Sequence, residues 1–297
     1  MKSQKAASGR LPYIYVLPVI VLLTLVIVYP MLYAVLLSFG RFGSRLDFHF
    51  VGLDNFRRVL ARAQFWVSAR NSLVFTGVSV LCQTLLGFCI ALLLNHRSLP
   101  CKKLFRVIFV IPWTVTPVIV ATIWVWMYNP QHGIINEILV RFGLIKQYVP
   151  WLGLPGKAMA AAIATNTWRG TPFVMLGLLA GLQAIPQEQY EAARVDGANS
   201  LELFYYVTLP NLRTVLSVLV VLNTIWNFKL FDIIYVMTGG GPAGTTEILP
   251  TLIYRTAFEN GNFGEAASVA VMMFIGIVFI VACYLRMVTD AATGRGS

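Results

Sequence analysis

Long apolar runs separated by short polar connections dominate the pattern of this chain. A helix needs about 20 apolar residues to cross a bilayer, and six stretches meet that length. Only helices and closed barrels span lipid, and runs this long exclude barrel strands. We therefore expect an all-α polytopic membrane protein, with one transmembrane domain over 1–297. The six transmembrane helices are expected at about 13–39, 71–94, 104–128, 158–184, 214–237 and 266–286.

Two connections carry apolar residues at helical spacing. Residues 55–67 mix such residues with arginines, which is typical of a short amphipathic helix lying on the membrane interface. The connection 130–157 carries Ile135, Ile138 and Leu139 at the same kind of spacing. Either segment can serve as a docking surface or simply shield the edge of the helix bundle.

Composition supports the membrane interpretation. The chain has 297 residues, of which 58% are hydrophobic and only 12% charged. Soluble domains carry about 25% charged residues. The net charge of +11 resides in short connections between apolar runs, which is the pattern of membrane flanks. We therefore expect no nucleic-acid partner.

The orientation in the membrane follows from the shortest connection. Residues 96–105 carry Arg97, Lys102 and Lys103, and short cytoplasmic loops are enriched in such residues. This favours cytoplasmic N- and C-termini, although the other basic residues divide nearly evenly between the two sides. The first apolar run is too long for a cleaved signal peptide, so we expect it to stay as an anchor.

The connection at 185–213 is long and rich in helix formers. Pro186 stands where a helix begins, and Glu191 favours its N-terminal half. Gly197 should break that helix, and Pro210 should end a second helical segment. The result is a pair of short helices at the cytoplasmic surface, a shape that suits insertion into a partner's groove.

Eight residues of this connection stand at the positions of a known motif. They are Glu191, Ala192, Ala193, Asp196, Gly197, Ala198, Leu209 and Pro210. Their spacing resembles the EAA loop of the inner-membrane permease subunits of binding-protein-dependent ABC sugar importers. The resemblance implies the type I ABC importer permease fold and a coupling loop, 185–213, that docks onto an ATPase. The plainer alternative is an ordinary pair of interfacial helices.

Further positions resemble the maltose and glycerol-phosphate branch of these permeases. Thr238-Gly239-Gly240-Gly241-Pro242 follows the fifth predicted span, and Gly133, Asn136 and Trp151 match the connection after the third. The resemblance implies a multi-pass subunit of the bacterial cytoplasmic (inner) membrane, surrounded by lipid. Its partners would be a second permease, which we expect to be a paralogue, two ATPase subunits and an extracytoplasmic solute-binding protein.

The chain has no phosphate-binding loop of the GxxxxGK[ST] type, because Trp151 stands where the first glycine before Gly156-Lys157 is needed. We therefore expect no cofactor on this chain, with ATP and Mg²⁺ bound by the partner ATPase. The chain is expected to be a transport subunit and not an enzyme, with no catalytic residues and no metal site.

Polar residues inside two predicted spans mark the candidate substrate site. On each span they share one helix face, and a polar group in a span should face a cavity or the bundle interior. The residues are Asn166, Arg169, Gly170 and Phe173 on the fourth span, and Asn223, Trp226 and Asn227 on the fifth. In the family that the chain resembles, the sugar site lies on these two helices.

Each candidate also has a plainer interpretation. The asparagines could join helix to helix. Arg169 could pair with an acidic sugar, or it could bond a backbone carbonyl or Asp232. Lys229 and Asp232 are expected to form a local ion pair.

Two other classes compete with an ATP-driven importer. A secondary transporter predicts paired broken helices in matching positions of two halves, and Gly-Pro breaks do not recur in that way here. A membrane enzyme needs a cluster of acids, bases or metal ligands. The three histidines, His49, His96 and His132, lie in or near connections on different segments, so no such group assembles.

Overall fold

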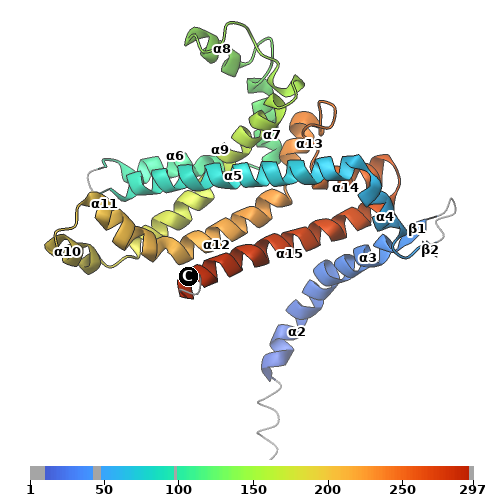
Figure 1. The fold of residues 1–297 in the computed structure, drawn as a ribbon, viewed down its shortest axis with the longest axis horizontal. Helices are drawn as coiled ribbons and strands as arrows, with labels where there is room; N and C mark the ends of the chain where they lie inside the picture. Colours follow the sequence, from blue (N-terminus) through green and yellow to red (C-terminus); the bar gives the residue numbers. More distant parts are fainter. Residues whose placement is uncertain (1–10, 43–47, 97–98, 294–297) are drawn as a thin grey trace, which may run out of the picture. The chain divides into compact units, whose positions relative to one another are not determined.

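The computed structural model describes residues 11–42, 48–96 and 99–293, and it is built almost entirely of helices (Figure 1). The helices are α2 Leu11–Leu23, α3 Tyr29–Ser38, α4 Asp54–Ala61, α5 Ala63–Asn95, α6 Lys102–Thr114, α7 Pro117–Met127, α8 Ile134–Arg141, α9 Lys157–Gln183, α10 Gln187–Val195, α11 Ser200–Glu202, α12 Leu209–Phe228, α13 Asp232–Thr238, α14 Leu249–Tyr254 and α15 Phe263–Thr293. Strands β1 Gly40–Phe42 and β2 Phe48–Phe50 form an antiparallel hairpin that the all-α prediction did not include.

The length and the apolar composition of the helices identify those that can cross a membrane. Within the described ranges four helices are long and apolar enough to cross a membrane, or five if one bent pair counts as a single span. The four are Tyr15–Ser38, Ala63–Asn95, Ser200–Phe228 and Phe263–Arg286. They correspond to the first, second, fifth and sixth predictions, and their outward side chains are apolar, as lipid requires. The chain is therefore a multi-pass membrane protein.

The third and fourth predicted spans differ from this pattern. The third is broken into α6 and α7, which meet at 97°. Pro117 lacks a backbone N–H and pushes Thr116 into an extended conformation, so the helix cannot continue through this point. The fourth forms α9, of 27 residues. It is the most polar of the long helices because its middle carries Asn166 and Arg169.

The fifth predicted span also ends early. We expected it to continue to Met237, but α12 ends at Phe228 and the short helix α13 follows. The backbone leaves the helix at Lys229, Leu230 and Phe231, so the last apolar residues of the prediction belong to α13.

The described chain divides into two compact units, Met1–Arg62 with Leu252–Phe274 and Ala63–Thr251 with Ile275–Ser297. Each unit is described by itself, and a single domain stays a prediction. In the first unit, Asn55 donates to the backbone oxygens of Ser38 (3.0 Å) and Gly40 (2.7 Å), which fastens the amphipathic helix α4 to the end of α3. Arg62 forms a bidentate ion pair with the buried carboxylate of Glu265.

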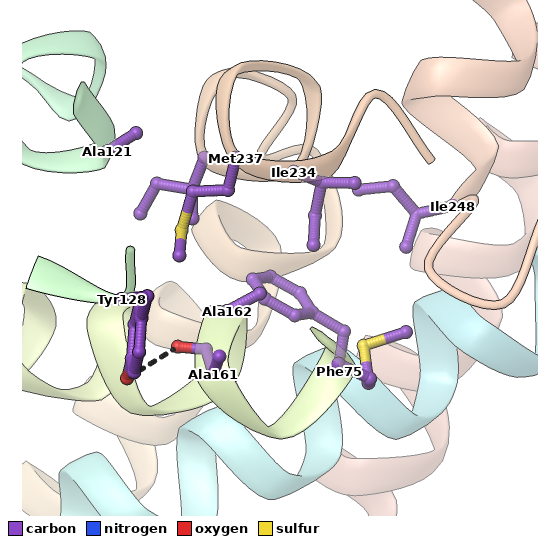
Figure 2. Packing of buried hydrophobic residues seen from close by; sticks show 10 residues of the cluster. Phe75, Ala121, Tyr128, Ala161, Ala162, Ile234, Met237 and Ile248 are labelled. Carbon is purple, nitrogen blue, oxygen red and sulfur yellow. Dashed lines mark hydrogen bonds between the residues drawn. The ribbon is translucent and has the colours of Figure 1, made fainter. Parts of the chain in front are cut away.

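In the second unit α5 and α9 pack along each other, and α12 packs against both. One apolar cluster surrounds Phe75, whose ring points toward Ile234 (Figure 2). A second cluster surrounds Met175, between α5, α9 and α12. Phe75, Gln83 and Ala91 are buried on α5 at intervals of eight residues, so Gln83 lies about 12 Å along the helix from either apolar residue.

The segments that carry the orientation argument are only partly described. The termini with Lys2, Lys5 and Arg10, and Arg97 of the short connection, lie outside the described residues. Helices form in both connections where they were predicted, as α4 and α8, although α4 ends at Ala61 and residues 63–67 of the predicted 55–67 segment belong to α5. Their place on the membrane interface stays a prediction.

Candidate functional site

Three side-chain amides from three helices, together with one backbone carbonyl, form a closed ring of hydrogen bonds between the two apolar clusters. Gln83 on α5 donates to the backbone oxygen of Asn166 on α9 (2.8 Å). The Asn166 side chain donates to Asn227 Oδ1 on α12 (2.5 Å), and Asn227 Nδ2 donates back to Gln83 Oε1 (3.1 Å). All three residues are at most 5% exposed.

The direction of these bonds is fixed by the backbone. The carbonyl of Asn166 can only accept, so the Gln83 amide must turn its nitrogen toward it. The side-chain oxygen of Gln83 then faces Asn227 and can only accept, so Asn227 must donate to it through Nδ2. Asn227 Nδ2 also donates to the backbone oxygen of Asn223 (2.8 Å). No amide of the ring can be turned over without placing two donors or two acceptors face to face.

The ring forms part of the wall of a small cavity of about 50 Å³. All seven site residues predicted from the two helix faces line this cavity: Asn166, Arg169, Gly170, Phe173, Asn223, Trp226 and Asn227. The wall is completed by Leu230, which continues the face of the fifth predicted span, and by Gln83 and Trp113, which were not predicted. Gln83 had one signal in the sequence, because it is an amide in the middle of an apolar span.

Two nitrogen donors on this wall have no partner among the described residues. Asn223 accepts from Asn227 through Oδ1 (2.8 Å), which leaves its Nδ2 buried and unbonded. The Nε atom of Arg169 is also buried without a partner. A buried donor left unbonded costs about 1–3 kcal/mol. Two buried N–H groups without a hydrogen-bond acceptor therefore lie beside the amide ring.

A wider cavity of about 400 Å³ adjoins the small one. The two share Trp113, Arg169, Trp226 and Leu230, and the wider one adds Pro117, Lys229, Phe231 and Asp232. Aromatic rings stand at this boundary, where Phe173 packs on Trp226 with centroids 4.5 Å apart. The wider cavity has the size of ordinary small-molecule pockets, which measure roughly 300–1,000 Å³.

One expectation about this region needs correction. Lys229 and Asp232 were expected to pair as neighbours on one helix. The helix breaks between them, and no ion pair joins them in the described structure. Gly170, a candidate substrate contact, also has a packing role. A Cβ placed there would lie 2.3 Å from Gln83 Nε2, so the missing side chain makes room for Gln83.

The second candidate site is the helix pair after α9. Pro186 precedes α10 as predicted, and Gly197, with φ +90°, ends it. The N–H of Ala198 bonds the carbonyl of Ala193 (2.9 Å) and that of Gly197 bonds Arg194 (3.0 Å), which is the Schellman arrangement.

The second helix of the pair begins at a capping box. Asn199 accepts from the N–H groups of Leu201 and Glu202, while its own N–H donates to the Glu202 carboxylate (2.7 Å). Tyr190 and Thr208 share a hydrogen bond (3.0 Å), which holds α10 against the following helix. The turn between the two helices is therefore shaped by local bonds of the chain itself.

Pro210 does not end a helix, which corrects the prediction. One helix runs from Ser200 to Phe228, and a π-helical segment at Leu203–Thr208 precedes the proline. The wider π-helical turn lets the chain pass a residue that lacks an N–H.

The coupling-loop candidates lie on α10, on its terminal turn and on the start of α12. On α10 Glu191 and Ala192 are exposed and Ala193 is half-buried. In the turn Asp196 and Gly197 are exposed and Ala198 is half-buried. On α12 Leu209 is half-buried and Pro210 is exposed.

The connection after α7 is tied together by one buried side chain. Asn136 is 0% exposed, donates to the backbone oxygens of Asn129 and Val149, and accepts from Val149 N and Trp151 Nε1. A Cβ at Gly133 would lie 2.4 Å from the Asn129 oxygen. These three motif positions, Gly133, Asn136 and Trp151, therefore hold the connection in one shape.

Comparison with known proteins adds a family match. Residues 83–291 match the model of the binding-protein-dependent transport system inner membrane component. The trehalose/maltose transport system permease protein of Thermococcus litoralis is 39% identical over 284 residues, 95% of either chain. The sulfoquinovosyl glycerol transport system permease protein of Agrobacterium fabrum is 34% identical, over 91% of this chain and 88% of that one.

A solved structure shares the fold. It is a chain of a bacterial ABC transporter involved in the import of the acidic polysaccharide alginate. The TM-score is 0.84 at 24% identity, covering 98% of this chain and 99% of that one.

Proposed function

Because this chain belongs to the family of binding-protein-dependent transport system inner membrane components, it is a permease subunit of an ATP-driven importer, and we propose that it carries a sugar, an oligosaccharide or a sugar derivative. The sugar class is supported by relatives whose names give trehalose, maltose and sulfoquinovosyl glycerol as cargo. Family membership favours this function over a secondary transporter that is not coupled to an ATPase.

The fold we propose is the type I importer permease with six spans. The four apolar spans and the bent pair α6–α7 supply five, and α9 supplies the sixth, since its 27 residues extend about 40 Å. A helix this polar can lie in a membrane when its polar face is turned inward, and Asn166 and Asn227 are buried against each other. Cytoplasmic termini in the bacterial inner membrane belong to the same proposal.

The single observation that carries the coupling role is the exposed, locally braced helix α10. Glu191 bonds within the helix, to Gln187 (2.6 Å), and its carboxylate faces outward. Local caps shape the turn around Gly197, so the helix pair needs no partner to set its geometry. We place the ATPase docking surface here: Glu191, Ala192, Ala193, Asp196, Gly197, Ala198, Leu209 and Pro210.

The remaining partners follow from this role. Two ATPase subunits would bind ATP and Mg²⁺, a second permease would complete the pathway, and a binding protein would deliver the substrate. The movement of the ATPases would pull α10 and turn the substrate site from one side of the membrane to the other, as in other alternating-access transporters. We propose that the residues around the two adjoining cavities contact the substrate during that cycle.

The deciding experiment purifies the chain in mild detergent and identifies bound proteins by mass spectrometry. We expect an ATPase and a second six-span permease at near-equal amounts, and ATP-driven sugar uptake after reconstitution with the binding protein. Recovery of the chain alone, or only as a homodimer, in every detergent tried would contradict the proposal and favour a secondary transporter.

A further inference from the structure

The small cavity beside the amide ring offers hydrogen-bond donors and a positive charge. The side-chain oxygens of Gln83 and Asn227 accept within the ring, and that of Asn223 accepts from Asn227. Among its described lining residues, the buried atoms without a partner are both nitrogen donors, Asn223 Nδ2 and Arg169 Nε. A ligand group that bonds these two donors must bring acceptors.

The charge of the wall points to the same kind of ligand group. Arg169 stays protonated in proteins, and no aspartate or glutamate stands among the described residues that line the small cavity. The wider cavity adds Lys229 and Asp232, and the negative charge of Asp232 acts on Arg169, although no ion pair joins the two among the described residues. The charges of Arg169 and Lys229 against that of Asp232 leave the two cavities with one net positive charge, and Arg169 stands on the wall that they share. A cation inside a membrane protein calls for an anionic partner.

The sizes of the two cavities fit a substrate that has one small group and one larger ring. On the same measure one water needs about 10–15 Å³, so a cavity of about 50 Å³ admits a group of a few heavy atoms. A sugar ring does not fit there. The adjoining cavity of about 400 Å³ has room for a ring and presents Trp113, Trp226 and Phe231, whose faces suit its apolar side.

From this arrangement we propose that the transported sugar carries an oxyanion, a carboxylate, sulfonate or phosphate, which enters the small cavity and accepts from Arg169 and Asn223. The sugar ring lies in the wider cavity against the two tryptophans. The inference rests on the proposed import function and names the chemical class of its cargo. Arg169 and Asn223 are then the residues that distinguish a charged from a neutral substrate.

The test uses the complete importer, with its binding protein, in proteoliposomes. The probes are a labelled disaccharide that contains glucuronic acid and its neutral glucose counterpart. We compare wild type with Arg169→Gln and Arg169→Lys. The binding protein is a separate chain and keeps its affinity in every variant, so any change arises in the permease. Arg141→Gln, at an exposed arginine of α8, is the control.

We expect ATP-driven uptake of the anionic probe, a fall of at least about tenfold in Arg169→Gln, partial recovery in Arg169→Lys and no change in the control. Asn223→Asp covers the case in which Arg169→Gln does not fold, because it keeps the oxygen that Asn227 needs while it removes the free donor and adds a negative charge. It should depress anionic uptake more than tenfold.

Two results overturn the inference alone: import of the neutral probe only, or equal uptake of the anionic probe by wild type and by correctly folded variants. Absence of ATP-driven uptake of both probes, in an assembled importer that hydrolyses ATP, overturns the proposed sugar import, and the inference falls with it.

Discussion

The side chain of Asn166 on α9 donates a hydrogen bond to that of Asn227 on α12, across 61 residues of sequence. This bond joins the two polar helix faces that sequence analysis identified separately. Both interpretations of the asparagines therefore meet in one place: they hold helices together, and the atoms beside them line a cavity. In this structure Asn166 and Asn227 bond each other, and the unbonded donors belong to Asn223 and Arg169.

Gly170→Ala tests the ring through its tightest contact. The new methyl group would meet Gln83 Nε2 at 2.3 Å and expel Gln83 from the ring. We expect a loss of about 1–3 kcal/mol, measured as a lower apparent melting temperature of the purified chain in detergent. Gly77→Ala on α5, where a Cβ meets nothing within 4 Å, should leave that temperature unchanged or higher.

A second variant separates the clash from a general weakening of α9. With Gln83→Ala in place, the Gly170 methyl group has room, so the two changes together should cost less than their sum. Strict additivity would mean that Gln83 and Gly170 do not compete for the same space.

Glu191→Lys tests the docking surface. Glu191 is exposed and bonds within α10, so the chain should stay folded, with stability within about 0.5 kcal/mol of wild type. We expect loss of ATPase copurification and of ATP-driven uptake. Glu137→Lys reverses a comparable charge on α8 and should retain both activities. If Glu191→Lys still transports at the normal rate, α10 is not the docking helix.

Gly197→Ala tests the turn that follows α10. A left-handed backbone costs a residue with a Cβ about 1–2 kcal/mol. Gly143, with φ +69° and likewise open space, is a matched control because Gly143→Ala carries the same strain in a different connection. We expect both variants to show the same small loss of stability and only Gly197→Ala to lose uptake, in parallel proteoliposome assays. Equal uptake by the two would remove this turn from the coupling mechanism.

The connection around α8 should respond to acid. The hydrogen bond from Tyr148 and then the charge of Arg141 hold the pKa of Glu137 below its ordinary value of 4.5. A lowered pKa means that this carboxylate stabilises the fold above pH 4.5, and that the stabilisation is lost as the pH falls through the lowered value.

Hydrogen exchange of α8, compared with Tyr148→Phe at each pH, checks this expectation. The wild-type helix should exchange more slowly at neutral pH, and the difference should close in acid. A difference that persists unchanged below the lowered pKa would show that the tyrosine acts through packing and not through Glu137.

Much of the architecture was predictable because bilayer length and apolar runs are local properties. The seven predicted residues around the small cavity were found because helical spacing places residues i, i+3, i+4 and i+7 on one face. Gln83 was missed because its role depends on α5 lying against α9, which no local pattern of α5 encodes. Its signal was an amide in an apolar span.

The errors have equally physical causes. Pro210 was expected to end a helix, but a π-helical segment before it lets the helix continue. Lys229 and Asp232 were expected to share a helix face, but the backbone breaks between them. In both cases the outcome depends on the backbone conformation that the chain adopts at one point, a π-helical segment before Pro210 and a helix break after Phe228. The spacing of residues in the sequence does not indicate that conformation.

The amide ring has a mechanical consequence. Gln83, Asn166 and Asn227 can bond in only one order, so α5, α9 and α12 cannot slide past one another by one helical turn, about 5.4 Å, without losing every bond of the ring at once. We therefore expect these three helices to move together in a transport cycle. The breaks next to them, at Val115–Thr116 between α6 and α7 and at Lys229–Phe231 between α12 and α13, are places where the backbone can bend instead.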